Sequence, residues 1–332
     1  MHAAVLVLSW NAAEALLACH ASLAAQQRPP ELTLVVDNGS LDGVADQVAA
    51  TFPGVTLIRN PQNLGFAGGM NTGLRALQAL AEPPEAVVLL NQDTQVDPDW
   101  LAAILAPLEA DPAVAAVGCK IRYPDGRLQH AGIALDSRSI VRHLGWHEPD
   151  SGQYDTEHDC DYVTGAALAL RMSALAMVGL LDEGYSPAYF EDLDLCWRLR
   201  RAGYRVVYAP TATLAHHESL SLRDEVSRSA YYNRGRLRFV LKSYPLNDLA
   251  EHFLHDELAF LSKHIGIDEG RVLRWAYAET WLALEDLIAA RRAIEPESST
   301  SATFHALLLA LHRGQAEIWR RKASERADWM FR

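Results

Sequence analysis

The stretch Val87–Thr94, VVLLNQDT, runs from four consecutive aliphatic residues directly into a polar turn. A short, uninterrupted apolar run of this kind is typical of a strand that is covered on both faces of a sheet. In open α/β sheets, ligands bind beyond the carboxyl ends of the strands, so Asp93 stands where chemistry is expected. Its carboxylate could bind a divalent metal ion together with a substrate phosphate. A strand that merely ends in a polar turn is the alternative interpretation of this fragment.

The residues on either side repeat the same strand-and-helix unit. Strands are predicted at 3–8, 32–36 and 55–59, and helices at 12–25, 42–52, 63–80 and 97–108. Strands that alternate with helices favour a mainly parallel sheet joined by right-handed crossovers. The glycine-rich segment 63–73 lets the backbone come close to a ligand and opens a helix whose N-terminus suits an anion. It matches neither a dinucleotide fingerprint nor a P-loop, so a purely structural role stays open.

The second half of the chain adds further candidate elements. Residues 114–162 are less regular, and their four histidines do not have the spacing of metal ligands. A strand at 167–170 and a helix at 173–178 follow, and then a helix that begins at Glu191 and Asp192 and ends at Gly203. Acidic residues at a helix start also suit the helix dipole, so Glu191 and Asp194 have a structural alternative. A strand at 205–208 precedes His216 and His217, and the segment 224–241 is a basic helix.

Beyond Pro245 the pattern changes to long helices at 249–264, 269–294 and 303–329. The last of these ends in basic and aromatic residues from Trp319 onward. Such an end suits contact with an anionic membrane, but packing or homodimer formation would use the same residues.

Composition limits the class of protein. The 332 residues are 49% hydrophobic and 22% charged, as in ordinary soluble globular proteins. A net charge of −12 argues against a nucleic-acid partner and means that an anionic substrate needs local positive charge. The four cysteines are far apart and form no CxxC pair, which predicts reduced thiols. With no secretory signal recognised at the start and no apolar stretch long enough to span a bilayer, we expect a cytoplasmic protein, at most on the inner face of the membrane.

Seven segments, taken in order, resemble the family 2 inverting glycosyltransferases with the GT-A fold, and within them the bacterial rhamnosyltransferase-like branch. The segments are VLVLSWN (5–11), VVDNGSLDG (35–43), NLGFAGGMNTG (63–73), LLNQDTQVDPDWL (89–101), YVTGAALALR (162–171), YFEDLDLCWRLRRAGYRVVYAP (189–210) and HHESLS (216–221). Each is weak alone, whereas their occurrence together in this order is specific. The resemblance implies a catalytic GT-A domain at 1–245, an α/β fold, followed by a helical region at 246–332 that matches no known motif.

The resemblance also implies where a nucleotide-diphosphate-sugar donor binds. Ser9 and Asn11 would meet its base and ribose, Asp37 would pair with the base, and Asn71 is the expected direct contact within the 63–73 segment. Asn91-Gln92-Asp93 occupies the DxD position of the family, with Asn91 in place of the first aspartate. The full set of donor-binding candidates is Ser9, Asn11, Asp37, Asn38, Asn63, Gly65, Asn71, Asn91, Gln92, Asp93, Gly165 and Arg234. Arg234 matches an arginine that is usually followed by asparagine, but Gly235 follows here.

The chemistry that the resemblance implies needs a cation and a base. Asp93 and His216 match the ligands of Mg²⁺ or Mn²⁺, and His217 is the less favoured neighbour. Asp192, with Glu191 beside it, matches the catalytic base that takes the proton of an acceptor hydroxyl. A single displacement with inversion needs no enzyme nucleophile, and the sequence offers none with a base partner. We expect residues 114–162 to shape the acceptor side of the cleft.

The predicted function is therefore a metal-dependent inverting glycosyltransferase. Its donor would be a nucleotide-diphosphate-sugar, with dTDP-rhamnose one candidate, and its acceptor a hydroxyl of a saccharide or lipid-linked glycan in polysaccharide, glycolipid or glycoconjugate synthesis. Two alternatives share the fold. A sugar nucleotidyltransferase should carry a glycine- and lysine-rich N-terminal signature, which the Ser9–Asn11 region lacks. A catalytically silent nucleotide-sugar-binding module would have lost Asp93 or Asp192, and both are present.

Overall fold

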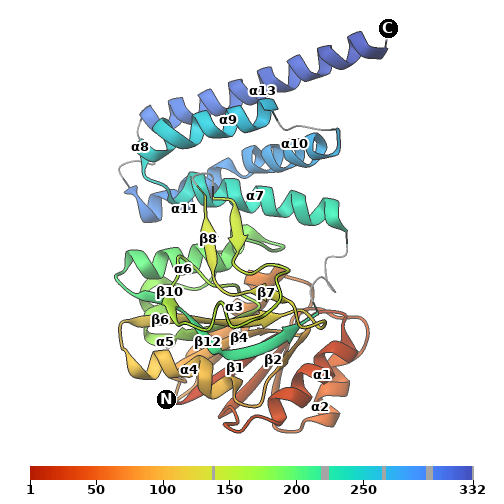
Figure 1. The fold of residues 1–332 in the computed structure, drawn as a ribbon, viewed down its shortest axis with the longest axis vertical. Coiled ribbons are helices and arrows are strands. Elements are labelled where there is room, and N and C mark those ends of the chain that lie inside the picture. The colour runs from red at the N-terminus through yellow and green to blue at the C-terminus, as the bar shows by residue number, and fades with distance from the viewer. Residues whose placement is uncertain (137–138, 218–223, 264–266, 297–301, 331–332) are drawn as a thin grey trace. The chain divides into compact units, whose positions relative to one another are not determined.

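The computed structural model describes residues 1–136, 139–217, 224–263, 267–296 and 302–330 (Figure 1). The chain forms two compact units. The first contains Met1–Ala134 and Val141–Asp224, and the second contains Leu135–Ile140 and Glu225–Arg332. Of the predicted motif HHESLS, only the two histidines lie within the described residues.

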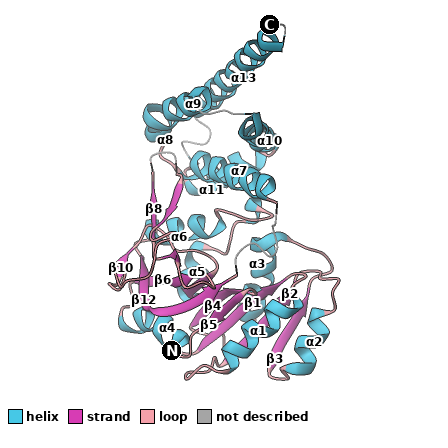
Figure 2. Cartoon of the chain, turned by 45° about the vertical axis from the view of Figure 1, so that its right-hand side comes forward, coloured by secondary structure: helices cyan, strands magenta, loops and turns pink. Residues whose placement is uncertain are grey.

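The first unit is built on one large twisted sheet with the order β10-β12-β6-β11-β4-β1-β2-β3 (Figure 2). Its first four strands are parallel neighbours: β1 (Ala3–Ser9), β2 (Leu32–Asp37), β3 (Val55–Arg59) and β4 (Ala86–Asn91). The helices that connect them are α1 (Ala13–Ala24), α2 (Val44–Thr51) and α3 (Gly65–Gln78). These elements agree with the predicted ones to within two or three residues, because each strand is a short apolar run flanked by turn residues.

Both faces of this sheet are covered, as the continuous apolar runs predict. Val5 and Val7 of β1 face α1, α2 and the later helix α4 (Trp100–Ala110) in one apolar core. Leu6 and Leu8, on the opposite face, lie under α3. Because side chains alternate along a strand, β1 has no face left for water.

The other half of the sheet contains an antiparallel strand. This strand, β11 (Ala167–Arg171), lies between β4 and β6 (Val114–Arg122) and is antiparallel to both, while β12 (Arg205–His216) is parallel to β6. The sheet also includes β5 (Thr94–Val96), β7 (Leu128–His130) and β10 (His158–Asp159), and β8 (Ile133–Leu135) pairs with β9 (Val141–His143). Helices α5 (Met172–Val178) and α6 (Glu191–Arg201) flank the 3₁₀ turn η1 (Glu183–Tyr185).

Two strands are longer than the sequence predicts. The expected strand at 205–208 continues to His216, and an irregularity between Ala209 and Thr213 accommodates Pro210, which has no N–H to donate. The segment that begins at Val114, read as irregular, forms a nine-residue strand in the middle of the sheet. Both strands end at the same edge as β4.

The second unit is helical. It contains α7 (Glu225–Ser243), α8 (Leu246–Asp248), a π-helical turn η2 (Leu249–Phe253), α9 (Leu254–Lys263), α10 (Ile267–Leu282), α11 (Leu284–Ile294) and α13 (Ala302–Met330). The predicted helix 269–294 is interrupted at Ala283. Helix α7 packs on α10 and α11, so the compact units divide before α7, at Asp224, rather than at Pro245. None of the described helices combines the length and hydropathy that crossing a lipid bilayer requires.

Candidate active site

The carboxyl ends of β4 and β12 bring two candidate metal ligands together. Asp93 follows β4, and His216 is the last residue of β12, where it pairs with Thr94 of β5. The Nε2 atom of His216 lies 3.1 Å from Oδ1 of Asp93, and both side chains are buried. His217 has an exposed side chain and contributes only its backbone N–H, which donates to the carbonyl oxygen of Asp93.

The orientation of His216 is fixed by a residue that the sequence did not single out. Gln129 of β7 lies with Oε1 2.7 Å from Nδ1 of His216, so Nδ1 donates to this oxygen and the contact sets the orientation of the ring, whose Nε2 faces Asp93. Two ligand atoms at right angles on an ion with bonds of about 2.1 Å lie about 3.0 Å apart. The observed separation of 3.1 Å therefore fits a small divalent cation shared by Asp93 and His216.

The described residues contain no cluster of three or more His, Cys, Asp or Glu side chains arranged to hold a metal ion. A cation on Asp93 and His216 would thus keep most of its coordination positions for water and for substrate oxygens. This is the usual pattern for Mg²⁺ at phosphate-binding sites.

The two residues before Asp93 have different roles. The side-chain nitrogen of Asn91 lies 3.5 Å from Nε2 of His216, at the edge of the same cluster. Gln92 turns away and bonds the backbone of Trp10 twice: its Oε1 accepts from the N–H at 2.9 Å, and its Nε2 donates to the carbonyl oxygen at 3.0 Å. Gln92 therefore ties the loop after β1 to the loop after β4.

Asp192 lies at the same edge of the sheet. Its two carboxylate oxygens accept the N–H groups of Gly165 and of Leu193, each at 2.8 Å. The next residue, Ala166, accepts the N–H of Asn91 at 2.9 Å. Asp192 is thus linked through Gly165 and Ala166 to Asn91, the last residue of β4, and the role of Asp192 as catalytic base stays a prediction.

The electrostatic setting of Asp192 suits a base. Burial raises the pKa of its carboxyl group above the ordinary value, although the N–H groups of Gly165 and Leu193 act in the opposite direction. The turn before α6 is unusual, because Tyr189 and Phe190 have φ angles of +81° and +79°. Such backbone is strained for residues with side chains, and strain of this kind tends to occur at functional sites.

The acidic neighbours of Asp192 are more deeply buried. Glu191 is 5% exposed, and Asp194 is fully buried. Asp194 accepts hydrogen bonds from the Tyr185 hydroxyl and from Nε of Arg198, and Arg198 also donates to three carbonyl oxygens at 178–180. Asp194 thus has a structural role, because it anchors Tyr185 and Arg198.

The candidates for the nucleotide base lie at the ends of β1 and β2. Oδ1 of Asp37 accepts a hydrogen bond from the N–H of Ser40 at 3.0 Å, and the other carboxylate oxygen remains available to a ligand. Asn11 has a φ of +47° and accepts the N–H of Leu41 at 2.8 Å. Ser9 is fully buried, and its hydroxyl has no hydrogen-bond partner among the residues that the structure describes.

The side-chain amides of Asn38 and Asn71 are engaged in hydrogen bonds within the protein. Asn38 donates to Asn63 and to the carbonyl oxygen of Gly65, and its oxygen accepts from Asn60 and Leu64. Asn71 is 1% exposed. Its side chain donates to the carbonyl oxygen of Leu181 and to the carboxylate of Glu183 and accepts the N–H of Leu181, in three hydrogen bonds of 2.8–3.1 Å. Direct donor contact by Asn38, Asn63, Gly65 and Asn71 stays a prediction.

Two glycines of α3 approach the sheet. A Cβ atom on Gly69 would lie 2.4 Å from Cδ1 of Leu8, and one on Gly73 would lie 2.3 Å from Cδ1 of Leu6. These glycines therefore allow α3 to pack closely on β1, which is the structural role left open for the segment.

The four cysteines are free and buried, as predicted. Burial raises the pKa of Cys196, which lies in α6 near Asp192, to about 12. A thiol held neutral in this way is a poor nucleophile.

The sequence itself decides the family. The family described as Glycosyl transferase family 2 matches residues 4–171, about half of the chain. The chain belongs to this family. A relative from Mycobacterium tuberculosis, named N-acetylglucosaminyl-diphospho-decaprenol L-rhamnosyltransferase, is 30% identical over 239 residues, which cover 66% of this chain and 78% of the relative. The uncharacterized protein y4gI of Sinorhizobium fredii is 30% identical over 238 residues, or 68% of this chain, but this match spans only 25% of that relative's length.

Solved structures agree on the fold. The mannosyltransferase PcManGT from Pyrobaculum calidifontis, solved with GDP-Man and Mn²⁺, superposes with a TM-score of 0.52 at 20% identity and covers 95% of this chain and 87% of its own. The predicted GT-A fold with a helical C-terminal part, and the assignment to the rhamnosyltransferase-like members of family 2, are confirmed.

One of the predicted donor-binding residues of this family 2 chain, Arg234, lies in the second compact unit, whereas the others lie in the first. Arg234 belongs to α7, where its guanidinium carbon lies 5.9 Å from the ring centroid of Tyr231. Gln129, in contrast, belongs to the site and was missed. No sequence signal indicated it, because it stands in a three-residue strand within a segment that has no clear periodicity.

Proposed function

We propose that this chain is a metal-dependent inverting glycosyltransferase that moves a sugar from a nucleotide-diphosphate donor to a hydroxyl acceptor. The observation that carries the proposal is the position of Asp192, held by Gly165 beside the strand that brings Asp93 to His216. A base and a cation site at one sheet edge are what a single displacement needs.

In this proposal, Asp192 accepts the proton of the acceptor hydroxyl as the oxygen attacks the anomeric carbon. The bond from that carbon to the diphosphate oxygen breaks from the opposite side, which inverts the centre without an enzyme nucleophile. Asp93 and His216 would hold Mg²⁺ or Mn²⁺. When bound, the ion would neutralise charge on the departing diphosphate.

The donor side of the proposal rests on Asp37, which has an oxygen free to pair with a nucleobase, together with Ser9 and Asn11 at the neighbouring strand end. We take dTDP-rhamnose as the first donor to test, because a relative that covers two thirds of the chain is named an L-rhamnosyltransferase. The proposed acceptor is a hydroxyl of a saccharide or of a lipid-linked glycan.

The test is a donor panel. The purified chain is incubated with Mn²⁺ and dTDP-rhamnose, UDP-glucose or GDP-mannose, and release of the nucleoside diphosphate is measured with and without candidate acceptors. We expect binding and turnover with one donor. The absence of binding and turnover for every donor would overturn the proposal. Release of pyrophosphate from a nucleoside triphosphate and a sugar 1-phosphate would instead identify a nucleotidyltransferase.

A further inference from the structure

An aromatic cluster lies just beyond the end of β6. Its members are Tyr123, Trp146 and His147, which we call the ring cluster. The rings of Tyr123 and His147 are stacked, with centroids 4.7 Å apart and an interplanar angle of 6°. Trp146 lies 4.7 Å from His147 and donates its Nε1–H to the Tyr123 hydroxyl at 2.7 Å. Nevertheless, 61% of Trp146 is exposed, which is uncommon for a tryptophan.

Two sets of contacts bring the chain segments that carry the ring cluster close to the segments that carry the candidate cation site. Arg122 pairs with Ala215 where β6 runs parallel to β12, and the next residues on the two chains are Tyr123 and His216. In addition, β7 contacts both features through adjacent residues. Gln129 holds His216, while Leu128 exchanges backbone hydrogen bonds of 2.8 Å with His147 and Glu148.

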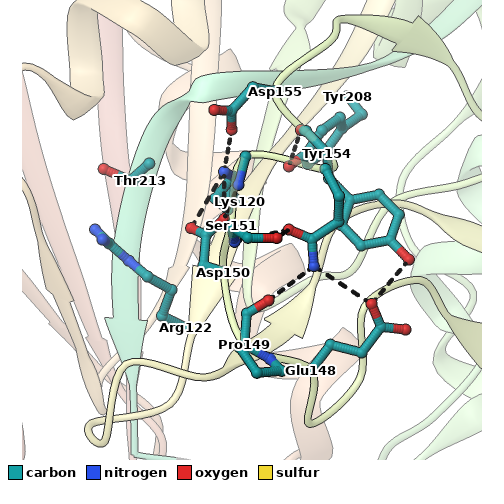
Figure 3. A network of polar contacts seen from close by, with 12 residues as sticks. Lys120, Arg122, Glu148, Pro149, Asp150, Ser151, Tyr154, Asp155, Tyr208 and Thr213 are labelled. Carbon is teal, nitrogen blue, oxygen red and sulfur yellow. Dashed lines mark hydrogen bonds and ion pairs between the residues drawn. The ribbon is translucent and has the colours of Figure 1, made fainter.

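The loop that carries Trp146 and His147 continues into residues 150–155, which are anchored to β6 and β12. Figure 3 shows the Lys120 ammonium between the carboxylates of Asp150 and Asp155, and Lys120 is only 4% exposed. The Tyr208 hydroxyl also donates to the carbonyl oxygen of Tyr154 at 3.2 Å. A buried lysine with two carboxylate partners fixes the loop, so its rings need little ordering when a ligand binds.

The backbone of this loop is strained at the ring cluster. His147 has a φ of +63°, a conformation that residues with side chains rarely adopt. Gly145 has a φ of +76°, and a Cβ atom there would lie 2.9 Å from Cδ1 of Leu128 and 3.0 Å from Cε2 of Tyr154. The chain therefore accepts strain to present Trp146 and His147, which points to function rather than packing.

The chemistry around the rings selects among ligands. Aromatic faces pack against the C–H faces of pyranose rings, while nearby carboxylates accept hydrogen bonds from hydroxyl groups. Two carboxylates flank the ring cluster. Glu148 follows His147 directly, and its Oε2 accepts from the Tyr154 hydroxyl and from Nε2 of Gln153, each at 3.4 Å. Asp125 is close enough to His147 to interact electrostatically and is paired with Arg127 at 2.7 Å. Exposed aromatics flanked by acids, in a chain of net charge −12, do not suit an anionic lipid surface.

From this arrangement, we propose that the ring cluster is a saccharide-binding subsite that receives a pyranose of the acceptor. The proposal rests on the proposed glycosyltransferase function and names the part of the site where acceptor specificity is set. Tyr123 and Trp146 would supply the stacking surface, and Glu148 would bind hydroxyl groups.

The test compares the wild-type chain with Trp146→Ala on a printed array of bacterial saccharides that contain hexoses, N-acetylhexosamines and 6-deoxyhexoses. We expect the wild-type protein to bind at least one of these saccharide classes, and Trp146→Ala to bind the same class at least tenfold more weakly. Trp146→Phe, which keeps an aromatic face, should retain more binding than Trp146→Ala. Met177→Ala is the matched control, because Met177 is 66% exposed in α5 and should bind the array like wild type.

The same preparations are titrated with dTDP and UDP in the presence of Mn²⁺, which separates this proposal from the proposed function. Wild type and Trp146→Ala should bind nucleotide equally and should unfold at the same temperature. Equal saccharide binding by the two proteins, or no saccharide binding by wild type, would overturn the subsite even if nucleotide binds. Saccharide binding without any nucleotide binding would overturn the transferase and, with it, the acceptor role.

Discussion

At the scale of single residues, Asp192 is the most direct test of the mechanism. We expect Asp192→Asn to lower the rate of transfer by about 10²- to 10⁴-fold, because the acceptor hydroxyl loses its base. Donor affinity should stay within about twofold, since the Asp192 oxygens contact Gly165 and Leu193 rather than the nucleotide-binding strand ends. Single-turnover transfer and equilibrium titration of the donor measure the two effects.

Asp161→Asn is the matched control, because Asp161 is exposed and pairs with Arg200 at 2.7 Å. It should leave the transfer rate unchanged. An Asp192→Asn protein with nearly full activity would show that another group takes the proton.

The raised pKa of Asp192 predicts how activity depends on pH. The base must be deprotonated, so kcat/KM for transfer should fall as the pH is lowered through the pKa of this carboxyl group. Burial raises that pKa, and the acidic limb should therefore lie above the ordinary aspartate value of about 3.9. A pH–rate profile measured at saturating metal gives the limb. A limb at or below the ordinary value would contradict the assignment.

His216 and Gln129 provide a test of the cation site. We expect a chelator to abolish transfer and Mn²⁺ to restore it. Gln129→Leu should weaken Mn²⁺ binding by about 10- to 100-fold, as loss of a partner that orients a ligand commonly does. His216→Ala should weaken it at least as much. Calorimetric titration of Mn²⁺ in the presence of nucleotide measures both, and the exposed Gln47→Leu is the control. Unchanged Mn²⁺ affinity in His216→Ala would remove His216 from the site.

At the scale of elements, the sequence predicts β1 to β4 and their helices well because each strand is a compact apolar run between turn residues. It fails where tertiary contacts decide. Pro210 suggested that the strand beginning at Arg205 stops early, yet pairing with β6 and β5 carries it on to His216. The resemblance to family 2 singled out Asp93 and His216 as candidate metal ligands, whereas nothing indicated Gln129, because only the register of β7 brings it to His216.

Close packing between elements also supports the segment 163–165, whose Gly165 donates its N–H to Asp192. A Cβ atom on Gly118 of β6 would lie 2.4 Å from Cβ of Val163, a fully buried, branched side chain that cannot move aside. Val163 begins the segment that ends at Gly165. We expect Gly118→Ala to lower the free energy of unfolding by about 1–3 kcal/mol through overpacking. Gly54→Ala, where nothing lies within 4 Å, is the control. Urea denaturation measures both, and equal stability of the two variants would contradict the packing argument.

At the scale of the whole molecule, the two compact units are stabilised in different ways. The first buries apolar side chains on both faces of its sheet, and those on the face covered by α1, α2 and α4 form one continuous cluster. The second places a charged cluster in its interior: Arg236 of α7 bonds both oxygens of Glu257 at 2.6 and 2.8 Å, and the Tyr277 hydroxyl donates to the same carboxylate at 2.9 Å. No pattern in the sequence indicated this cluster, because Arg236 is one of several basic residues in α7 and Glu257 lies in a different helix.

Removal of one partner from such a cluster leaves the other charge buried without compensation, which costs about 3–5 kcal/mol. We therefore expect Glu257→Gln to lower the free energy of unfolding by about 3 kcal/mol or more, since the guanidinium of Arg236 is 1% exposed. Nucleotide affinity at a temperature where the variant is folded should stay unchanged, because Glu257 and both partners lie in the second unit, whereas all the donor-site candidates except Arg234 lie in the first. Thermal unfolding and dTDP titration measure the two quantities, with the exposed Glu251→Gln as the control. Full stability in Glu257→Gln would show that the buried charges are dispensable, and lost nucleotide binding in a folded variant would show that the second unit governs the donor site.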